Sequence, residues 1–329
     1  MADIPLTIAC GPYDRMEGIR SGEVQIEGID PTYVAIQFPP EIFTRMIKQN
    51  AFDVAEMSAT TYLSLRPGGR FPFVAIPVFP SRVFRHGFIY INTRAGIGSP
   101  KDLEGKRIGS FGFGQTAAVW IRGILKDEYG VDLSTVRWFE IGEDPLKRAP
   151  VNGKVPERRV PVPIEWVGQP ASMSDLLAQG KIDALIGAQA PGALGRDPAV
   201  ARLFPNYRDV ERDYYRRTKI FPIMHIMVIR ESLHQEKPWI AESLFKAFNS
   251  SKQLAIRNMR FSGAMRYMLP WLYDDLDEID RTFGRDPWEY GLAPNRANLE
   301  ALARYLHEQG FVDHAIDIDK LFVPMVGGH

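Results

Sequence analysis

The chain has 329 residues, of which 40 are basic and 40 are acidic, so its formal net charge is zero. At about 150 residues per domain, this length favours about two domains. A composition with 45% hydrophobic and 24% charged residues is typical of a globular protein with a real core. The charge balance argues against a protein that binds nucleic acid or an anionic membrane, because both need an excess of basic residues.

The N-terminal sequence MADIPLTIAC has neither the basic segment nor the apolar segment of a secretory signal, so we expect a cytoplasmic protein. The single cysteine, Cys10, allows neither an intrachain disulfide nor a cysteine-based zinc cluster. No histidine lies near Cys10 in the sequence. A small buried residue is therefore a better interpretation of Cys10 than a nucleophile.

The first third of the chain alternates between the patterns of strands and helices. Short apolar runs at 6–9, 32–37 and 52–55 predict strands. Apolar residues at helical spacing predict a helix over 41–50. The apolar run 73–79 is interrupted by Pro77, which predicts an edge strand or a crossing segment.

The remaining elements follow from the same patterns. Residues 143–165 are rich in proline and basic residues and predict a solvated arm or hairpin. The other expected elements are strands at 88–91, 107–110, 136–141, 182–186 and 220–229, a helical turn at 99–103, and helices at 115–130, 174–179, 238–256 and 295–310.

Strands that alternate with helices indicate an α/β fold with largely parallel sheets. Ligands of such sheets bind outside the carboxyl ends of the strands. This rule selects four segments as candidate ligand contacts, namely 10–15, 56–58, 112–116 and 188–191.

Two polar residues next to apolar strands are candidates for proton transfer. Glu56 comes directly after the run 52–55, and in partly dry surroundings the pKa of a carboxyl group can rise enough for it to donate a proton. His225 interrupts the run 221–228, where a polar side chain has to be hydrogen-bonded or functional. An imidazole exchanges protons readily near neutral pH. A hydrogen-bonded structural role remains the alternative for His225.

A basic cluster follows the interrupted strand. On a regular strand Arg82 and His86 share one face, where they could bind a carboxylate, while Arg85 points to the other face. A structural role is the alternative for His86.

Two loops leave alternatives open. The turn Gly112-Phe113-Gly114 before an expected helix is either an anion cradle or a plain turn. Asp14 and Arg15 either contact a ligand or pair with each other. No metal site is expected, because His307 and His314 lack a third ligand.

Six segments together resemble the 4,5-dihydroxyphthalate decarboxylases. They are CGPYDR at 10–15, FDVAEMS at 52–58, FPSRVFRHGFIYIN at 79–92, DLEGKRIG at 102–109, QTAAVWIRGIL at 115–125 and FPIMHIMVIR at 221–230. The resemblance covers most of the chain in order. It implies an α/β fold like that of type II periplasmic binding proteins, with two lobes, two crossing segments and a ligand cleft. Lobe 1 would comprise 1–92 and 220–329, and lobe 2 would comprise 93–219.

The resemblance implies a cofactor-independent carboxy-lyase of aromatic compound degradation, which converts a 4,5-dihydroxyphthalate-like substrate into a dihydroxybenzoate and CO₂. Glu56 would deliver the proton to the ring and His225 would handle the phenol proton, or the reverse, with His86 as a substitute. A non-catalytic solute-binding or sensor protein for an aromatic or dicarboxylate ligand is the alternative. The expected partner is a small aromatic carboxylate, with no nucleic acid, membrane, cofactor or metal, and a homo-oligomer is left open. The expected substrate contacts are Arg82, Arg85, Asp14, Arg15, Ser58, Gly114, Gln115, Thr116 and Gln189.

Overall fold

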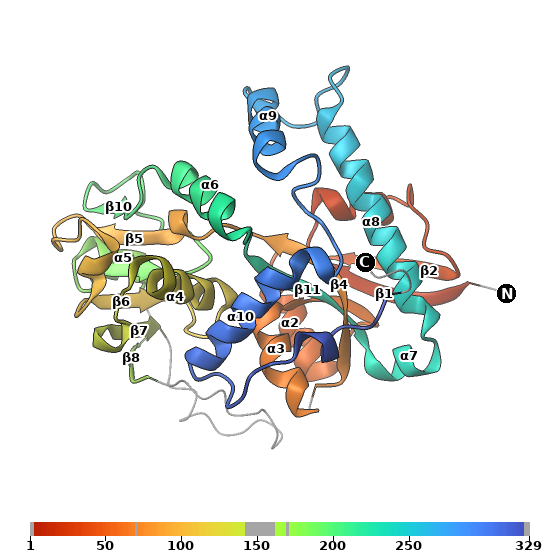
Figure 1. Cartoon of the computed structure of the whole chain (residues 1–329), viewed down its shortest axis with the longest axis horizontal. Coiled ribbons are helices and arrows are strands. Elements are labelled where there is room, and N and C mark those ends of the chain that lie inside the picture. The colour runs from red at the N-terminus through yellow and green to blue at the C-terminus, as the bar shows by residue number, and fades with distance from the viewer. Residues whose placement is uncertain (1–2, 70, 142–161, 169–170, 326–329) are drawn as a thin grey trace. The chain divides into compact units, whose positions relative to one another are not determined.

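The computed structural model describes residues 3–69, 71–141, 162–168 and 171–325. Its internal contacts divide the chain into two compact units, each built around one β-sheet (Figure 1). Unit 1 comprises Met1–Arg82, Ile223–Glu300 and Asp317–His329, and unit 2 comprises Val83–Pro222 and Ala301–Ile316. The expected α/β architecture is therefore present. Most of the arm or hairpin expected at 143–165 lies outside the described residues.

The contacts divide the chain at places that differ in part from the expected ones. The strand β5 (Ile89–Asn92), expected in the first lobe, pairs with β9 (Ala184–Ile186) and β10 (Val200–Arg202) and so belongs to unit 2. The second division, between Pro222 and Ile223, lies close to the expected residue 220. Residues 301–316 also belong to unit 2. The helix α10 (Arg296–Glu308) therefore has its first residues in unit 1 and the rest in unit 2.

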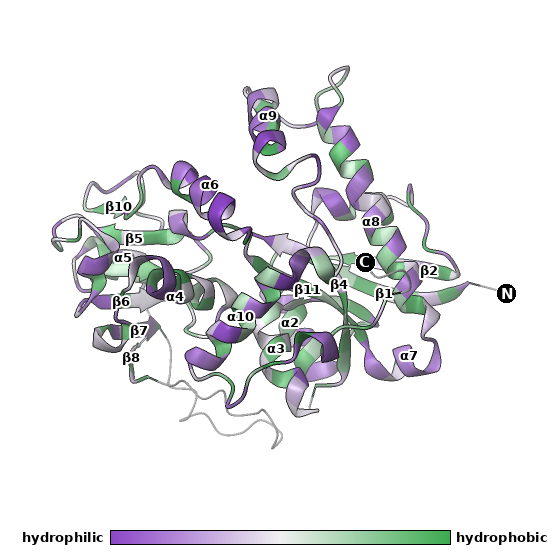
Figure 2. Cartoon of the chain, in the orientation of Figure 1, coloured by the Kyte–Doolittle hydropathy of each residue, from purple (hydrophilic) through white to green (hydrophobic). Residues whose placement is uncertain are grey.

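The sheet of unit 1 has the strand order β2-β1-β3-β11-β4. The strand β1 pairs in parallel with β2 and β3, whereas β11 is antiparallel to both β3 and β4. The inner strands are apolar over most of their length because both faces of the sheet are covered, and they appear mostly hydrophobic in Figure 2. The strands are β1 (Ile4–Cys10), β2 (Ile29–Ala35), β3 (Val54–Ser58), β4 (Phe73–Arg82) and β11 (Ile223–Arg230).

The edge position expected for the interrupted strand is confirmed by β4, which ends the sheet order. His225 of β11 pairs with Ser81, while Met227 pairs with Ile76, so β4 bulges between these two pairs. Pro77 and Pro80 lie in the bulge, and neither has an N–H to donate to the ladder. The bulge lies directly beside His225.

Helices complete unit 1. The expected helix at 41–50 is α2 (Pro39–Gln49), which packs on β3. The long helix α8 packs against α1, β4 and the turn Asp14–Met16. The sequence patterns did not predict α9, whose sequence is dominated by acidic residues. The helices not yet delimited are α1 (Glu17–Arg20), α3 (Ala59–Leu65), α7 (Glu231–Glu236), α8 (Trp239–Arg260) and α9 (Leu272–Phe283).

The sheet of unit 2 has the order β10-β5-β9-β6-β7-β8. The pairs from β9 to β8 are parallel, and β5 is antiparallel to its two neighbours. The helix expected at 115–130 is α4 (Thr116–Tyr129), which ends at Gly130 in the left-handed conformation. The other elements are β6 (Arg107–Ser110), β7 (Arg137–Ile141), β8 (Ile164–Val167), α5 (Met173–Ala178) and α6 (Tyr207–Thr218), the last of them mostly hydrophilic in Figure 2.

The basic cluster after β4 does not form the regular strand that the sequence suggested. β4 ends at Arg82, and His86–Phe88 form a short 3₁₀ turn before β5. The expected shared strand face of Arg82 and His86 is therefore wrong. In the part of the chain that the structure describes, no helix combines the length and the apolar character needed to cross a membrane.

Candidate active site

Glu56 is the central residue of β3, and its side chain has no exposed surface. Glu56 pairs with Met227 of β11, and Ser58 pairs with His225, so Glu56 and His225 are diagonal neighbours on one face of the sheet. This register brings together two residues that are 169 positions apart. Their side chains meet, with Nδ1 of His225 lying 2.5 Å from Oε1 of Glu56.

The His225 ring connects the buried carboxyl group with the exterior of unit 1. Its side chain is 19% exposed, and the edge of the Phe43 ring packs against it with 5.0 Å between the centroids. Because Nδ1 faces Glu56, Nε2 is the ring nitrogen left to exchange a proton with a ligand. The pair has the geometry in which a carboxylate fixes the orientation of an imidazole.

Three groups from the last residue of β1 and the segment after it complete the surroundings of Glu56. The backbone N–H of Gly11 donates to Oε2 at 2.9 Å, and the Tyr13 hydroxyl donates to Oε1 at 2.7 Å. The thiol of Cys10 lies 3.4 Å from Oε2. A Cβ on Gly11 would come within 2.7 Å of the Tyr13 ring, so only glycine lets the ring lie this close to the backbone. The hydroxyl of Tyr33 donates to the Gly11 carbonyl at 3.0 Å and holds the turn.

The donors around Glu56 reverse the expected direction of its pKa shift. Burial raises the pKa of this carboxyl group, but the positive charge of the His225 ring and the hydrogen bonds from His225, Tyr13 and Gly11 together lower it below its ordinary value. The expectation that Glu56 has a raised pKa is thus wrong, while its role as the acid stays a prediction. The lowered pKa favours the carboxylate form of Glu56.

The neighbours of the carboxylate remain protonated. Burial, and then the nearby charge of Glu56, raise the pKa of the Tyr13 hydroxyl. The same two causes raise the pKa of the Cys10 thiol well above its ordinary value. Cys10 is fully buried, so the structure agrees with the interpretation of Cys10 as a small buried residue.

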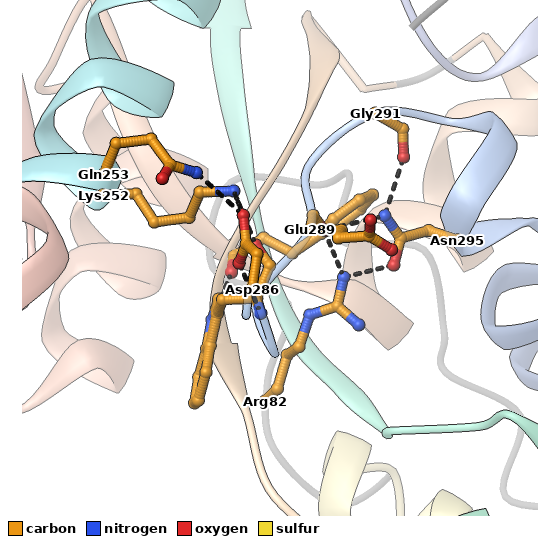
Figure 3. Close-up of polar contacts among 9 residues, drawn as sticks. Arg82, Lys252, Gln253, Asp286, Glu289, Gly291 and Asn295 are labelled. Carbon is orange, nitrogen blue, oxygen red and sulfur yellow. Dashed lines mark hydrogen bonds and ion pairs between the residues drawn. The ribbon is translucent and has the colours of Figure 1, made fainter. Parts of the chain in front are cut away.

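Arg82 makes its polar contacts within unit 1. Its Nη2 donates to the Glu289 carbonyl at 2.8 Å and also to Oδ1 of Asn295 (Figure 3). Its guanidinium lies 5.4 Å from the centroid of the Phe79 ring, and the residue is 6% exposed. Arg82 therefore fastens the segment 289–295 to the end of β4. A contact of Arg82 with a substrate stays a prediction.

Arg85 and His86 are buried in unit 2. Burial lowers the pKa of Arg85 to about 9, and its guanidinium lies 4.8 Å from the centroid of the Phe88 ring. His86 is 1% exposed and is surrounded by the rings of Tyr129, Phe204 and Tyr214. Burial lowers the pKa of His86 to about 4. Among the described residues, neither of its ring nitrogens has a hydrogen-bond partner.

The remaining predicted contacts are spread over both units. Asp14 and Arg15 of unit 1 pair with each other at 3.0 Å, as one alternative had it. Ser58 caps α3 by accepting from the N–H of Thr61. The others, all in unit 2, are the buried Gly114 and Thr116, the half-buried Gln115 and the exposed Gln189.

The turn before α4 is partly occupied by the protein's own groups. The N–H of Phe113 donates to the Glu140 carboxyl group, and the N–H of Gln115 donates to the Gly112 carbonyl at 2.9 Å. Oε1 of Gln115 is buried and has no partner among the described residues. These contacts are those of a turn closed by its own backbone and by the Glu140 side chain of β7, and they do not by themselves define an anion site.

Sequence reasoning missed Tyr13. The residue lies in the selected segment 10–15, but the pattern does not show that its side chain turns back over Gly11 toward β3. The same holds for the Gly11 N–H. In the described ranges, no three histidine, cysteine, aspartate or glutamate side chains are grouped as metal ligands.

Comparison with known proteins places the chain among relatives of similar length. Residues 27–157 match the family model described as NMT1/THI5 like. A 4,5-dihydroxyphthalate decarboxylase from Comamonas testosteroni is 38% identical over 328 residues, which are 98% of this chain and 98% of the relative. A protein of the same name from Pseudomonas putida is 38% identical over 218 residues, which are 66% of this chain and 83% of the relative.

Solved structures agree on the fold. The periplasmic aliphatic sulphonate binding protein SsuA from Escherichia coli matches with a TM-score of 0.57 and 13% identity, covering 100% of this chain and 95% of SsuA. A sulfonate-binding protein from Methylobacillus flagellatus matches with a TM-score of 0.55 and 14% identity, covering 98% and 93%. The fold is thus that of periplasmic binding proteins. By its identity to a curated relative over almost the full length of both chains, the protein belongs to the family of the 4,5-dihydroxyphthalate decarboxylases, which are carboxy-lyases.

Proposed function

We propose that the protein decarboxylates a hydroxylated aromatic dicarboxylate, 4,5-dihydroxyphthalate or a close analogue, and releases a dihydroxybenzoate and CO₂. The observation that carries this proposal is the contact of 2.5 Å between Glu56 and His225. It joins a fully buried carboxylate to a partly exposed imidazole in a chain of this family. Such a pair can bring a proton to a bound ligand, which is what this reaction needs.

The chemistry of the substrate explains why one mobile proton suffices. Each carboxyl group of 4,5-dihydroxyphthalate has a hydroxyl para to it. When that hydroxyl loses its proton, its electrons reach the carbon that bears the carboxylate, and this carbon takes up a proton. The bond to the carboxylate then breaks, CO₂ leaves, and the bonding electrons restore the aromatic ring as a phenolate, whose oxygen takes back the proton that the hydroxyl lost. The net change is the replacement of one CO₂ by one proton.

In this proposal Nε2 of His225 delivers the proton to the ring carbon. Glu56 stays ionised, accepts the hydrogen bond of Nδ1 and stabilises the positive charge of the imidazole before transfer. General acid catalysis of this kind contributes about 10²- to 10⁴-fold to a rate. Proton delivery by His225 is the reverse of the first assignment from the sequence, which left both open, and Glu56 now orients the imidazole, because His225, Tyr13 and Gly11 lower the pKa of Glu56.

The reaction as proposed needs no metal and no organic cofactor, because the para hydroxyl serves as the electron source and the ring as the electron sink. Arg82, Arg85, Ser58, Gln115 and the other predicted contacts remain candidates for holding the second carboxylate and the hydroxyls. A homo-oligomer stays a prediction.

A solute-binding or sensor protein without catalysis is the second candidate, and the likeness to sulfonate-binding proteins supports it. A binding protein would retain the ligand unchanged. The Glu56–His225 pair favours the enzyme, because a site that only binds a dianion gains nothing from a buried carboxylate beside the ring that contacts the ligand.

The test is to incubate the purified protein with 4,5-dihydroxyphthalate in deuterated buffer. We expect release of CO₂ and formation of a dihydroxybenzoate that carries one deuterium at the carbon that lost the carboxylate. Proton NMR of the product locates this deuterium. Tight binding of the phthalate without any product would instead support the binding protein.

A matched pair of variants links the activity to the site. His225→Asn should abolish product formation, whereas His234→Asn, a histidine in α7 of the same unit, should not. Equal activity of both variants would contradict the role of His225.

A further inference from the structure

Arg15 lies between two aromatic rings in unit 1. Its guanidinium carbon is 4.2 Å from the centroid of the Tyr13 ring and 4.5 Å from that of Trp288. In the plane of the guanidinium, Nε donates to the Pro80 carbonyl at 2.6 Å, Nη2 donates to the same carbonyl, and Nη1 donates to Asp14 at 3.0 Å. The guanidinium thus contacts both rings and is held by the Pro80 carbonyl and the Asp14 carboxylate, so Arg15 links the Tyr13 ring to the Trp288 ring.

Trp288 is itself held in place. Its Nε1 donates to the Phe79 carbonyl at 3.1 Å, and its backbone N–H donates to Oδ1 of Asp286 at 2.9 Å. The other oxygen of Asp286 accepts from Lys252 at 2.6 Å and from Gln253 at 2.9 Å (Figure 3). Lys252 also donates to the Trp288 carbonyl at 3.1 Å, and its side chain is 3% exposed.

We propose that Trp288, acting through Arg15, is a positioning residue that holds the Tyr13 hydroxyl on the Glu56 carboxylate. The stack fixes the face of the Tyr13 ring that points away from its backbone, while Gly11 leaves room for the ring to lie close to the chain. The contacts run from Trp288 through Arg15 to the Tyr13 ring, and they end at the hydrogen bond of 2.7 Å between the Tyr13 hydroxyl and Glu56. The proposal deepens the proposed function and rests on it where it concerns catalysis.

The consequence is a dependence of the activity on pH that Trp288 controls. The titratable groups that interact with Glu56 are Cys10, Tyr13, Tyr33 and His225, and the charge of Arg15 acts on Cys10 and Tyr13. The Tyr13 hydrogen bond lowers the pKa of Glu56, so its loss lets this pKa rise. Because the proposed chemistry needs the carboxylate, activity is lost as the pH falls through the pKa of Glu56. The acid limb of the pH profile is the range in which activity falls as the pH drops. Weakening the hydrogen bond between Tyr13 and Glu56 therefore moves this acid limb to higher pH.

The first experiment measures kcat/KM for 4,5-dihydroxyphthalate against pH in the full-length protein. Tyr13→Phe should move the acid limb to higher pH and lower kcat about tenfold with little change in KM, since hydrogen bonds to charged groups contribute at that level. Trp288→Leu should move the limb in the same direction, and Trp288→Phe, which keeps a flat ring, should restore it. Ionisations of the substrate are common to all variants and cancel in the comparison.

A matched control is Trp239→Leu. Trp239 also lies in unit 1 and is half exposed, but its ring packs on Gly28 and has no contact with Arg15 among the described residues. The acid limb of the Trp239→Leu variant should coincide with that of the unchanged protein. If Trp288→Leu does not fold, Arg15→Lys keeps the charge, removes the planar stack and should move the limb in the same direction.

A second readout does not require turnover. Infrared difference spectra of protein with ¹³C-labelled glutamate carboxyls, referenced to Glu56→Gln, follow the protonation of Glu56 without substrate. The titration should shift to higher pH in Tyr13→Phe and Trp288→Leu. This shift would stand even if no phthalate were decarboxylated, so failure of the proposed function and failure of this proposal are distinguishable. An unshifted titration in Trp288→Leu, or in Arg15→Lys in its place, would overturn the proposal, whatever Tyr13→Phe shows.

Discussion

At the scale of single residues, Glu56 is an unusual group because its carboxylate is fully buried and yet surrounded by donors from two segments of the chain. A buried carboxylate without such partners would neutralise itself by a raised pKa. Here the donors keep it charged, and the charge in turn orients the His225 ring. Burial is the largest single influence on the pKa of Glu56, but the charge of His225 and the hydrogen bonds together outweigh it.

Substitution of either member of the pair should remove catalysis and leave the fold intact. Glu56→Gln and His225→Asn are each expected to lower kcat by about 10²-fold or more, because each removes one half of the proton transfer. Steady-state kinetics together with circular dichroism and ligand titration check this. Glu27→Gln, at an exposed position in unit 1, is the control. If a variant folds normally and keeps nearly full kcat, the residue that it replaces has a structural role and no part in catalysis.

His86 predicts a pH dependence of stability. Its pKa is about 4 in the folded protein, against an ordinary value of 6.5, because burial disfavours the charged ring. Between these values the unfolded chain binds a proton that the folded chain does not, so the free energy of unfolding falls as the pH drops from 6.5 to about 4. His86→Phe should lose less stability over this range and keep its activity.

Urea denaturation at several pH values within that range measures the effect. The exposed His314→Phe should follow the pH dependence of the unchanged protein. Parallel curves for His86→Phe and the unchanged protein would show that His86 does not contribute in this way.

The sequence was sufficient to select Glu56 and His225, because both stand where an apolar strand meets a polar group. It could not give the direction of the Glu56 pKa shift. That direction depends on the orientation of Tyr13 and on a backbone N–H of Gly11, neither of which leaves a periodic signal in the chain.

At the scale of elements, most strands and helices were predictable because their apolar residues repeat with a clear period. The order of the strands was not, since β11 joins β3 and β4 across more than 140 residues and this pairing has no local signature. The end of β4 at Arg82 was missed for a similar reason. The apolar character continues to Phe84, but the bulge and the turn at His86–Phe88 redirect the chain.

The contact between α4 and α10 in unit 2 should not tolerate a larger residue at Gly123. A Cβ there would lie 2.3 Å from the Tyr305 ring, which packs on Trp120 and whose hydroxyl donates to Asp127 at 2.8 Å. Gly123→Ala gains about 1 kcal/mol of helix propensity, but overpacking costs about 1–3 kcal/mol. We expect net destabilisation in thermal or urea unfolding.

The control for this prediction is Gly68→Ala, at which a Cβ would meet nothing within 4 Å. It should be neutral or slightly stabilising. Stabilisation by Gly123→Ala would mean that α4 and α10 separate readily at this contact.

At the scale of the whole molecule, the proposed chemistry predicts independence of metal ions. Activity should survive exhaustive treatment with a chelator, because the para hydroxyl of the substrate and the Glu56–His225 pair supply what the reaction needs. The measurement is CO₂ release before and after chelation and after gel filtration into metal-free buffer. Loss of activity that zinc, manganese or iron restores would overturn the mechanism.

The place of β11 inside the sheet of unit 1 has a consequence for how the chain folds during synthesis. The first 82 residues provide β1 to β4. However, β3 and β4 do not pair with each other, because β11, which begins at Ile223, lies between them in the sheet. Contacts of such long sequence separation slow folding. We therefore infer that unit 2, most of which is continuous in the chain, orders first on the ribosome. The contact between Glu56 and His225 then forms only after some two thirds of the polypeptide has emerged.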